Sequence, residues 1–168
     1  NWAGLITDAG TPAVSDPGAR LVRACQEEGI PISGIPGPSA LTLALSICGL
    51  WADRVVWNGF FPRKSNAENL QKTLSAAESS LQVWFESPER VVKTVGLLAQ
   101  AFPEDELWVG KELTKFFEEA WFGKCSELAA KFSSEVEPQG EWVLVLHRPA
   151  IPPVQRSDFD DTLVCLWR

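Results

Sequence analysis

The chain has 168 residues, of which 45% are apolar, and carries a formal net charge of −7. That length allows a buried core and one or two folded units, and the acidic balance argues against a protein coated in basic surface. No stretch approaches the roughly twenty apolar residues that a membrane span needs, so the composition argues against a membrane protein.

The four cysteines and the single histidine, His147, are scattered along the chain and form no CxxC pair. Such spacing predicts neither a zinc site nor a disulfide framework. We therefore expect free thiols in a reducing compartment and no bound metal.

Strand-like and helix-like segments alternate over the first fifty residues. An apolar run at 4–7 is typical of a buried strand end. Asp16 is a good N-cap residue with a proline after it, and the helix that it begins would end at Gly29. A second strand is predicted over 30–35 and a second helix over 39–49. This β-α-β-α order favours a parallel sheet covered by helices.

The second part of the chain alternates again, with shorter connections that also allow antiparallel neighbours. Strands are predicted over 55–61, 81–85, 107–109, 119–122 and 142–146, and helices over 65–78, 88–102 and 126–132. We expect an α/β fold with three parts. Residues 1–52 would belong to an N-terminal α/β domain, 53–148 would form a C-terminal α/β domain, and 149–168 would be a Pro-rich tail or linker.

Two loops that follow predicted strands are candidates for ligand binding. The stretch ITDAGTPAVSDPG (6–18) contains Gly10, which permits positive φ and close approach, and the acceptors Asp8 and Asp16. Open α/β sheets bind ligands where their strands end, although an ordinary strand-to-helix turn explains these residues equally well. The second loop, PGPSA (36–40), is either a rigid turn or a space for a flat ligand. Neither loop contains a Walker A or GxGxxG pattern.

Three later blocks place charged residues at the ends of predicted strands. GFFPRK sets Arg63 and Lys64 after an apolar run, FESPER sets Glu86 at a strand end, and KELTK contains Lys115. A solvated loop, a capped helix dipole and an exposed salt-bridged loop explain the same three blocks without a function. The chain shows no Ser/His/Asp arrangement for nucleophilic catalysis.

Taken in order, six blocks resemble one known family: DAGTPAVSDPG, IPGPSAL, GFFPRK, FESPER, KELTK and GEWVLVL. They are similar to the ribosomal RNA small subunit methyltransferase I family of the tetrapyrrole methylase superfamily, and the resemblance runs from about Leu5 to Leu146. It implies a two-domain tetrapyrrole-methylase-like α/β fold that binds S-adenosylmethionine between its domains. It also implies a cytoplasmic homodimer that methylates the 2′-hydroxyl of a decoding-region cytidine in the rRNA of the small ribosomal subunit.

The resemblance also assigns roles to individual residues of this sequence. The cofactor would contact Asp8, Ala9, Gly10, Thr11, Ser39, Ala40, Phe85 and Thr114. Arg63, Lys64, Arg90 and Lys115 would face RNA or organise the cleft. A ribose hydroxyl is a poor nucleophile, so Glu86 would act as a base and Lys115 would stabilise developing negative charge.

The chain departs from the family pattern in two respects. It has Lys111 where the family usually has arginine, which removes a bidentate donor. It also lacks the TPIGN-like and EDTR-like segments that precede the first block, so we expect a first domain truncated at its N-terminus. Two alternatives stay open: a methyltransferase of tetrapyrroles or other small molecules, and a non-catalytic fragment or interaction module.

Overall fold

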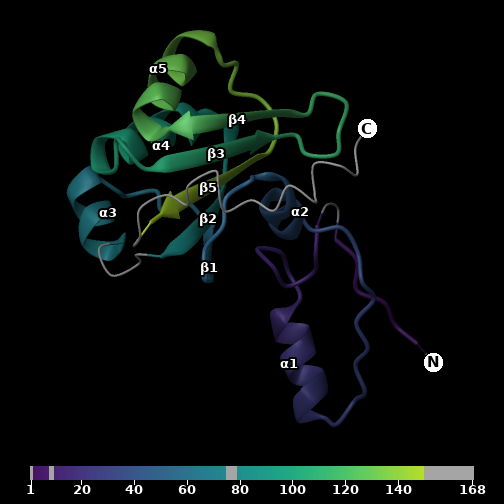
Figure 1. The fold of residues 1–168 in the computed structure, drawn as a ribbon. Helices are drawn as coiled ribbons and strands as arrows, with labels where there is room; N and C mark the ends of the chain where they lie inside the picture. Colours follow the sequence, from purple (N-terminus) through teal and green to yellow (C-terminus); the bar gives the residue numbers. More distant parts are fainter. Residues whose placement is uncertain (1, 8–9, 75–78, 150–168) are drawn as a thin grey trace, which may run out of the picture.

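A computed structural model describes residues 2–7, 10–74 and 79–149, and these residues build a five-stranded mixed sheet (Figure 1). The strands lie in the order β1-β2-β5-β3-β4. Strands β1 and β2 pair in parallel, and every other neighbouring pair is antiparallel. The strand bounds are β1 Arg54–Phe60, β2 Ser80–Glu86, β3 Glu106–Lys111, β4 Glu119–Lys124 and β5 Trp142–Arg148.

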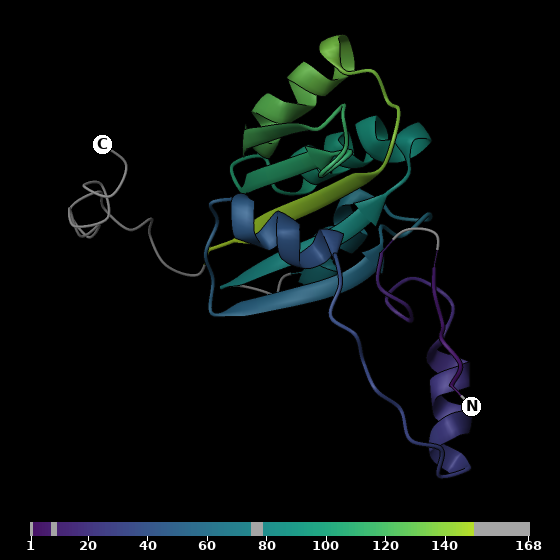
Figure 2. The ribbon, with the colours of Figure 1, turned by 90° about the vertical axis from the view of Figure 1, so that its right-hand side faces the viewer.

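Helices cover both faces of this sheet, so the fold has three layers (Figure 2). One face packs against α3 (Ala67–Leu74), α4 (Pro88–Ala101) and α5 (Cys125–Glu135), and the other against α2 (Ala40–Ile47). The central strand β5 contributes to both hydrophobic cores, because its side chains point alternately to the two faces of the sheet. Trp142, Leu144 and Leu146 enter the larger core, and Val143 and Val145 pack toward α2.

The predicted elements after residue 39 are confirmed, including the pairing of β3 with β4. Helix α4 shows why local rules suffice there. Ser87 is extended as the N-cap and Pro88 occupies the first helical position. Buried residues at Val91, Val95 and Leu98 then follow the helical period. The predicted helix over 65–78 is observed to Leu74, and 75–78 lie outside the described residues.

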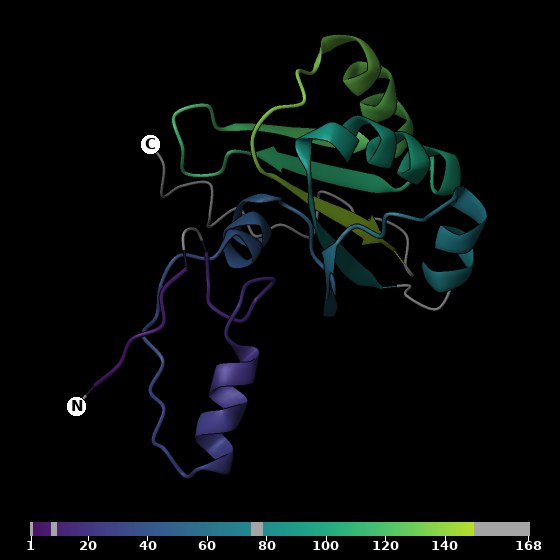
Figure 3. The ribbon, with the colours of Figure 1, turned by 180° about the vertical axis from the view of Figure 1, so that it is seen from behind.

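The first forty residues differ from the expectation. Helix α1 (Ala19–Glu27) projects away from the sheet and buries none of its residues (Figures 1 and 3). It begins after Gly18 rather than at Asp16, and it ends before Gly29, whose φ of 65° allows the chain to turn.

The strands predicted at 4–7 and 30–35 are absent, and both segments are irregular. Ile6 and Ile35 have 88% and 93% of their surface exposed. A strand is stable only when a neighbour satisfies its backbone groups, and among the described residues neither segment has such a neighbour. The apolar composition of both segments therefore predicted burial and a strand, and in this structure neither segment is buried or forms a strand.

The expected domain boundary near residue 52 stays a prediction. Helix α2, which precedes that boundary, packs on the sheet of the second predicted domain through Ala44 and Cys48. Of the predicted tail 149–168, only residue 149 is among the described residues. None of the described helices is long and apolar enough to cross a membrane.

Candidate active site

A cavity of about 700 Å³ opens at the edge of the sheet where β1, β2 and β3 end. Three groups of residues line it: the two N-terminal loops with α2, the ends of β1 and β2, and the β3–β4 loop with the start of β5. Ligands of open α/β sheets bind at this edge, and the volume falls within the range of ordinary ligand sites. All six blocks singled out in the sequence contribute lining residues: 8–18, 35–41, 59–64 (through Phe60), 85–90, 111–115 and 140–146.

The two N-terminal loops form the first wall and are tied to each other. The hydroxyl of Thr11 donates to the backbone oxygen of Pro38 over 3.2 Å. Gly10 has a φ of 96°, and a Cβ at this position would lie 3.4 Å from a carboxylate oxygen of Asp16. The predicted residues Gly10, Thr11, Ser39 and Ala40 all line the cavity. Asp8 and Ala9 lie outside the described residues.

Aromatic side chains at the ends of β1 and β2 form the second wall. The rings of Phe60 and Phe85 both border the cavity and meet edge to face, with 5.9 Å between centroids. Trp57 supports Phe85 from behind at 4.5 Å. An apolar wall facing hydroxyl-bearing loops is the composition expected of a site for a small organic ligand with polar ends.

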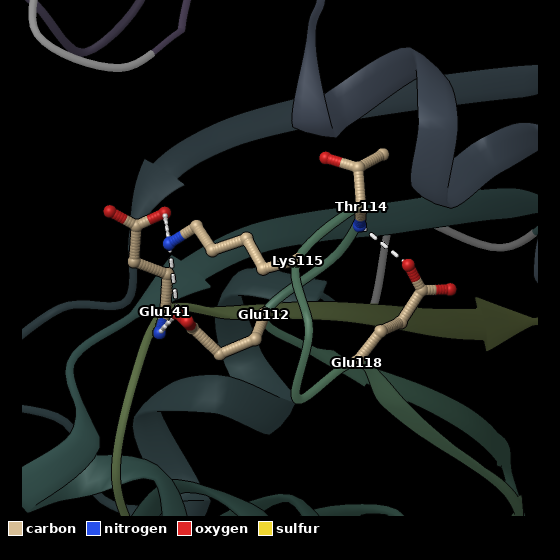
Figure 4. Close-up of polar contacts among 5 residues, drawn as sticks. All are labelled: Glu112, Thr114, Lys115, Glu118 and Glu141. Carbon is tan, nitrogen blue, oxygen red and sulfur yellow. Dashed lines mark hydrogen bonds and ion pairs between the residues drawn. The ribbon is translucent and has the colours of Figure 1, made fainter.

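The third wall is the β3–β4 loop, which carries Thr114 and Lys115 to the cavity (Figure 4). The ammonium group of Lys115 lies 2.9 Å from Oε1 of Glu112 and 3.0 Å from Oε2 of Glu141. The hydrogen bonds that Lys115 donates to Glu112 and Glu141 raise the pKa of Lys115, so this group is charged at neutral pH. The hydrogen bond from Lys115, followed by that from the Glu141 amide, lowers the pKa of Glu112. The backbone amide of Thr114 donates to Glu118, which holds the far side of the loop.

Glu86 borders the cavity, but its carboxylate is buried and fully engaged. Oε1 accepts from the amide of Ser87 at 2.7 Å and pairs with Arg90, while Oε2 accepts from the hydroxyl of Thr94 at 2.5 Å. Since Thr94 belongs to α4, the carboxylate lies on the α4 side of the sheet, opposite to Phe85.

The predicted substrate contacts lie outside the cavity lining. Arg90 joins two blocks, because its guanidinium donates to the backbone oxygen of Phe61 and to the hydroxyl of Ser87, each over 3.1 Å, and pairs with Glu86. Arg63 and Lys64 are exposed in the loop after β1, and neither forms an ion pair within the described part of the chain.

The sequence did not single out several lining residues. Thr42, Leu43 and Ser46 continue the helical face of α2 that begins at Ser39, so the helical period was an available signal for them. Glu141 has no comparable local signal, because its contacts with the β3–β4 loop are made across more than twenty residues of sequence. Among the described residues, no group of three or more His, Cys, Asp or Glu is placed to hold a metal ion.

The three-layer fold defines an α/β protein with a cavity at the edge of the sheet where β1, β2 and β3 end. Residues 4–129 match the model of the tetrapyrrole (corrin/porphyrin) methylases. The chain therefore belongs to the tetrapyrrole methylase family, and the expected fold class is confirmed.

Curated relatives share much higher identity with the chain than solved structures do. It is 39% identical to the ribosomal RNA small subunit methyltransferase I of Thermotoga maritima over 142 residues, which are 84% of this chain and 63% of that protein. The chain thus spans less than two thirds of the length of this relative.

Two solved structures, both of uroporphyrin-III C-methyltransferase from Thermus thermophilus, show the same fold. One is 20% identical with a TM-score of 0.57, covering 83% of this chain and 61% of that chain. The other, complexed with S-adenosylhomocysteine, is 21% identical with a TM-score of 0.50, covering 80% and 62%.

Proposed function

We propose that this chain carries the ligand-binding site of an S-adenosylmethionine-dependent methyltransferase. Its substrate would be the ribose 2′-hydroxyl of a decoding-region cytidine in small-subunit rRNA, modified in the cytoplasm by a homodimer. The observation that carries the proposal is the cavity in which the sequence blocks shared with rRNA methyltransferases meet. The identity to the Thermotoga maritima relative supports the RNA substrate.

The residues present fit the cofactor. The cavity has room for a nucleoside with an amino-acid tail, and it offers the hydroxyls of Thr11, Ser39 and Thr114 opposite the aromatic wall at Phe85. Gly10 and Ala40, together with Asp8 and Ala9 outside the described residues, would complete its binding set. When bound, S-adenosylmethionine supplies a methyl group that is activated by an adjacent sulfonium charge.

The chain's own contribution is positioning and electrostatics. Orienting donor and acceptor accounts for a large part of the acceleration in such displacements. Lys115, held charged at the rim, would stabilise negative charge on the ribose oxygen as the hydroxyl loses its proton to water. Arg63 and Lys64 would contact RNA phosphates.

Glu86 has a different role in this proposal from the one its sequence position suggested. Its carboxylate already accepts hydrogen bonds from Ser87 and Thr94 and pairs with Arg90. We therefore propose that Glu86 acts by holding Arg90, and thereby the loop after β1, rather than by accepting the substrate's proton.

Two measurements test the proposal. Calorimetric titration with S-adenosylhomocysteine should show binding to the wild-type chain and weaker binding to Thr11→Val, which loses the bond to Pro38. Small subunits that lack the ribose methyl should accept label from S-adenosylmethionine at a site that becomes resistant to alkaline hydrolysis, as a 2′-O-methyl does. Absence of S-adenosylhomocysteine binding would leave a non-catalytic interaction module as the better explanation.

A second candidate is methylation of a tetrapyrrole, which the family model and the solved relatives favour. The same labelled donor offered with uroporphyrinogen III in place of small subunits separates the two. Label in the tetrapyrrole and none in the RNA would replace the rRNA proposal with this one.

A further inference from the structure

Lys115 is held between two carboxylates that differ in how firmly they are anchored (Figure 4). Oε1 of Glu112 accepts from Lys115 and also from the backbone amide of Glu141, at 2.8 Å. The amide of Glu112 in turn donates to the backbone oxygen of Glu141, also at 2.8 Å. Glu112 is therefore part of the link between the β3–β4 loop and the segment that enters β5.

Gly140 leaves the space that the Glu112 side chain occupies. A Cβ at residue 140 would lie 2.5–2.7 Å from Cγ, Cδ and Oε1 of Glu112, closer than any normal contact. The Glu112 side chain is only 18% exposed. The Glu112 carboxylate is thus held by the backbone amide of Glu141 and lies against the backbone at Gly140, independently of its contact with the ammonium group.

The Glu141 carboxylate has none of these supports. Its side chain is 69% exposed, and among the described residues the carboxylate contacts only Lys115. An exposed ion pair of this kind contributes little net free energy, because water solvates both groups well when they separate. Another anion can therefore take its place at Lys115 at small cost.

We propose that Glu112 is a positioning residue that fixes Lys115 at the cavity rim, and that the Glu141 carboxylate occupies the place of a substrate phosphate and is displaced by it. The proposal rests on the RNA substrate proposed above. It explains why one lysine at the mouth of a ligand cavity has two carboxylate partners of such different exposure. Lys111, which ends β3, pairs with Glu119 instead and is the other lysine beside Glu112.

The test compares Glu112→Gln with Glu141→Gln. Each removes one carboxylate from the same lysine, and each keeps a side-chain oxygen that can accept a hydrogen bond. Binding of a short fluorescein-labelled single-stranded RNA to the full chain is measured by anisotropy over a series of salt concentrations. The control is Glu104→Gln, which removes an equally exposed carboxylate from a single lysine partner, Lys124, away from the cavity.

We expect opposite results from the two substitutions. Glu141→Gln should bind RNA as tightly as wild type or a few-fold more tightly. Any gain in affinity should be larger than the gain caused by Glu104→Gln. Glu112→Gln should bind several-fold more weakly. Lys115→Ala should also weaken binding and lower the slope of log affinity against log salt by about one, because one phosphate contact is lost.

A double-mutant cycle separates positioning from general structure. If Glu112 acts through Lys115, adding Glu112→Gln to Lys115→Ala causes no further loss of RNA affinity. An equal loss in both backgrounds would overturn the positioning role, and a loss in Glu141→Gln as large as that in Glu112→Gln would overturn the displacement. Failure of the wild-type chain to bind RNA would overturn both. Absence of methyl transfer with this binding pattern intact would count against the proposed function alone.

Discussion

Gly140→Ala is the substitution with the most specific expected cost. Gly140 has a φ of 80°, so an alanine there adopts the left-handed region at a cost of about 1 kcal/mol. The new Cβ also displaces the Glu112 side chain, which then loses its hydrogen bond from the Glu141 amide. A hydrogen bond to a charged acceptor is worth about 1.5 kcal/mol. The free energy of unfolding should therefore fall by about 2.5 kcal/mol in all, taking both principles together.

Gly49→Ala is the matched control. Gly49 has a φ of 69°, and a Cβ at this position meets nothing within 4 Å. Gly49→Ala should lower the free energy of unfolding only through backbone strain, by about 1 kcal/mol. The difference between the two glycines then measures the contact with Glu112.

Urea unfolding followed by tryptophan fluorescence gives both values, since the chain has eight tryptophans. In a Glu112→Ala background the cost of Gly140→Ala should fall to about 1 kcal/mol, the value for backbone strain alone. If Gly140→Ala costs no more than Gly49→Ala in the wild-type background, Glu112 is not held over Gly140 and the reasoning fails.

Three further predictions concern the cavity, a buried thiol and the ion pair between Glu86 and Arg90. Gly10→Val should weaken S-adenosylhomocysteine binding about tenfold in calorimetry, because a branched side chain is unfavourable at the φ of 96° that residue 10 adopts. The control Gly4→Val, where a Cβ meets nothing within 4 Å, should leave the affinity unchanged. Burial raises the pKa of the Cys125 thiol from 9.0 to about 12, so the folded state keeps a proton that the unfolded chain releases. The free energy of unfolding should accordingly fall as the pH rises from about 9 toward 12, and urea unfolding of Cys125→Ala should lack this part of the pH dependence. Arg90→Met should lower the free energy of unfolding by about 3 kcal/mol in the same assay, because it leaves the buried Glu86 without its ion-pair partner. Adding Glu86→Gln should recover part of this loss. Equal stability of the single and double variants would show that the two residues are not coupled.

Local rules were sufficient wherever an element carries its own signals. Helix α4 has an N-cap, a proline at its first position and a periodic apolar face, and these specify it without reference to the rest of the chain. Strand β5 begins with the continuous apolar run WVLVL, and β2 is apolar except at Ser80, Gln82 and Glu86; both strands are buried along most of their length.

The segments at 4–7 and 30–35 show the limit of those rules. Their composition is strand-like, yet a strand depends on hydrogen bonds to a neighbour that no local pattern specifies. Asp16 likewise satisfies the preference for an N-cap, but helix α1 begins after Gly18. At Asp16 the local signal predicted the right kind of element and the wrong first residue, whereas at 4–7 and 30–35 it predicted strands that do not form.

The candidate site, like the fold, could be predicted from the sequence only in part. The sequence by itself determined which residues offer suitable chemistry: the small loop residues around Gly10 and Ser39, the aromatic end of β2 and the cation Lys115. The tertiary structure alone decided which groups those residues face. It turned the Glu86 carboxylate toward Thr94 of α4. It also brought Glu141 to Lys115 across 26 residues of sequence. The physical reason is that residue type and spacing specify donors, acceptors and local geometry, whereas the partner of each group depends on how distant strands and loops pack.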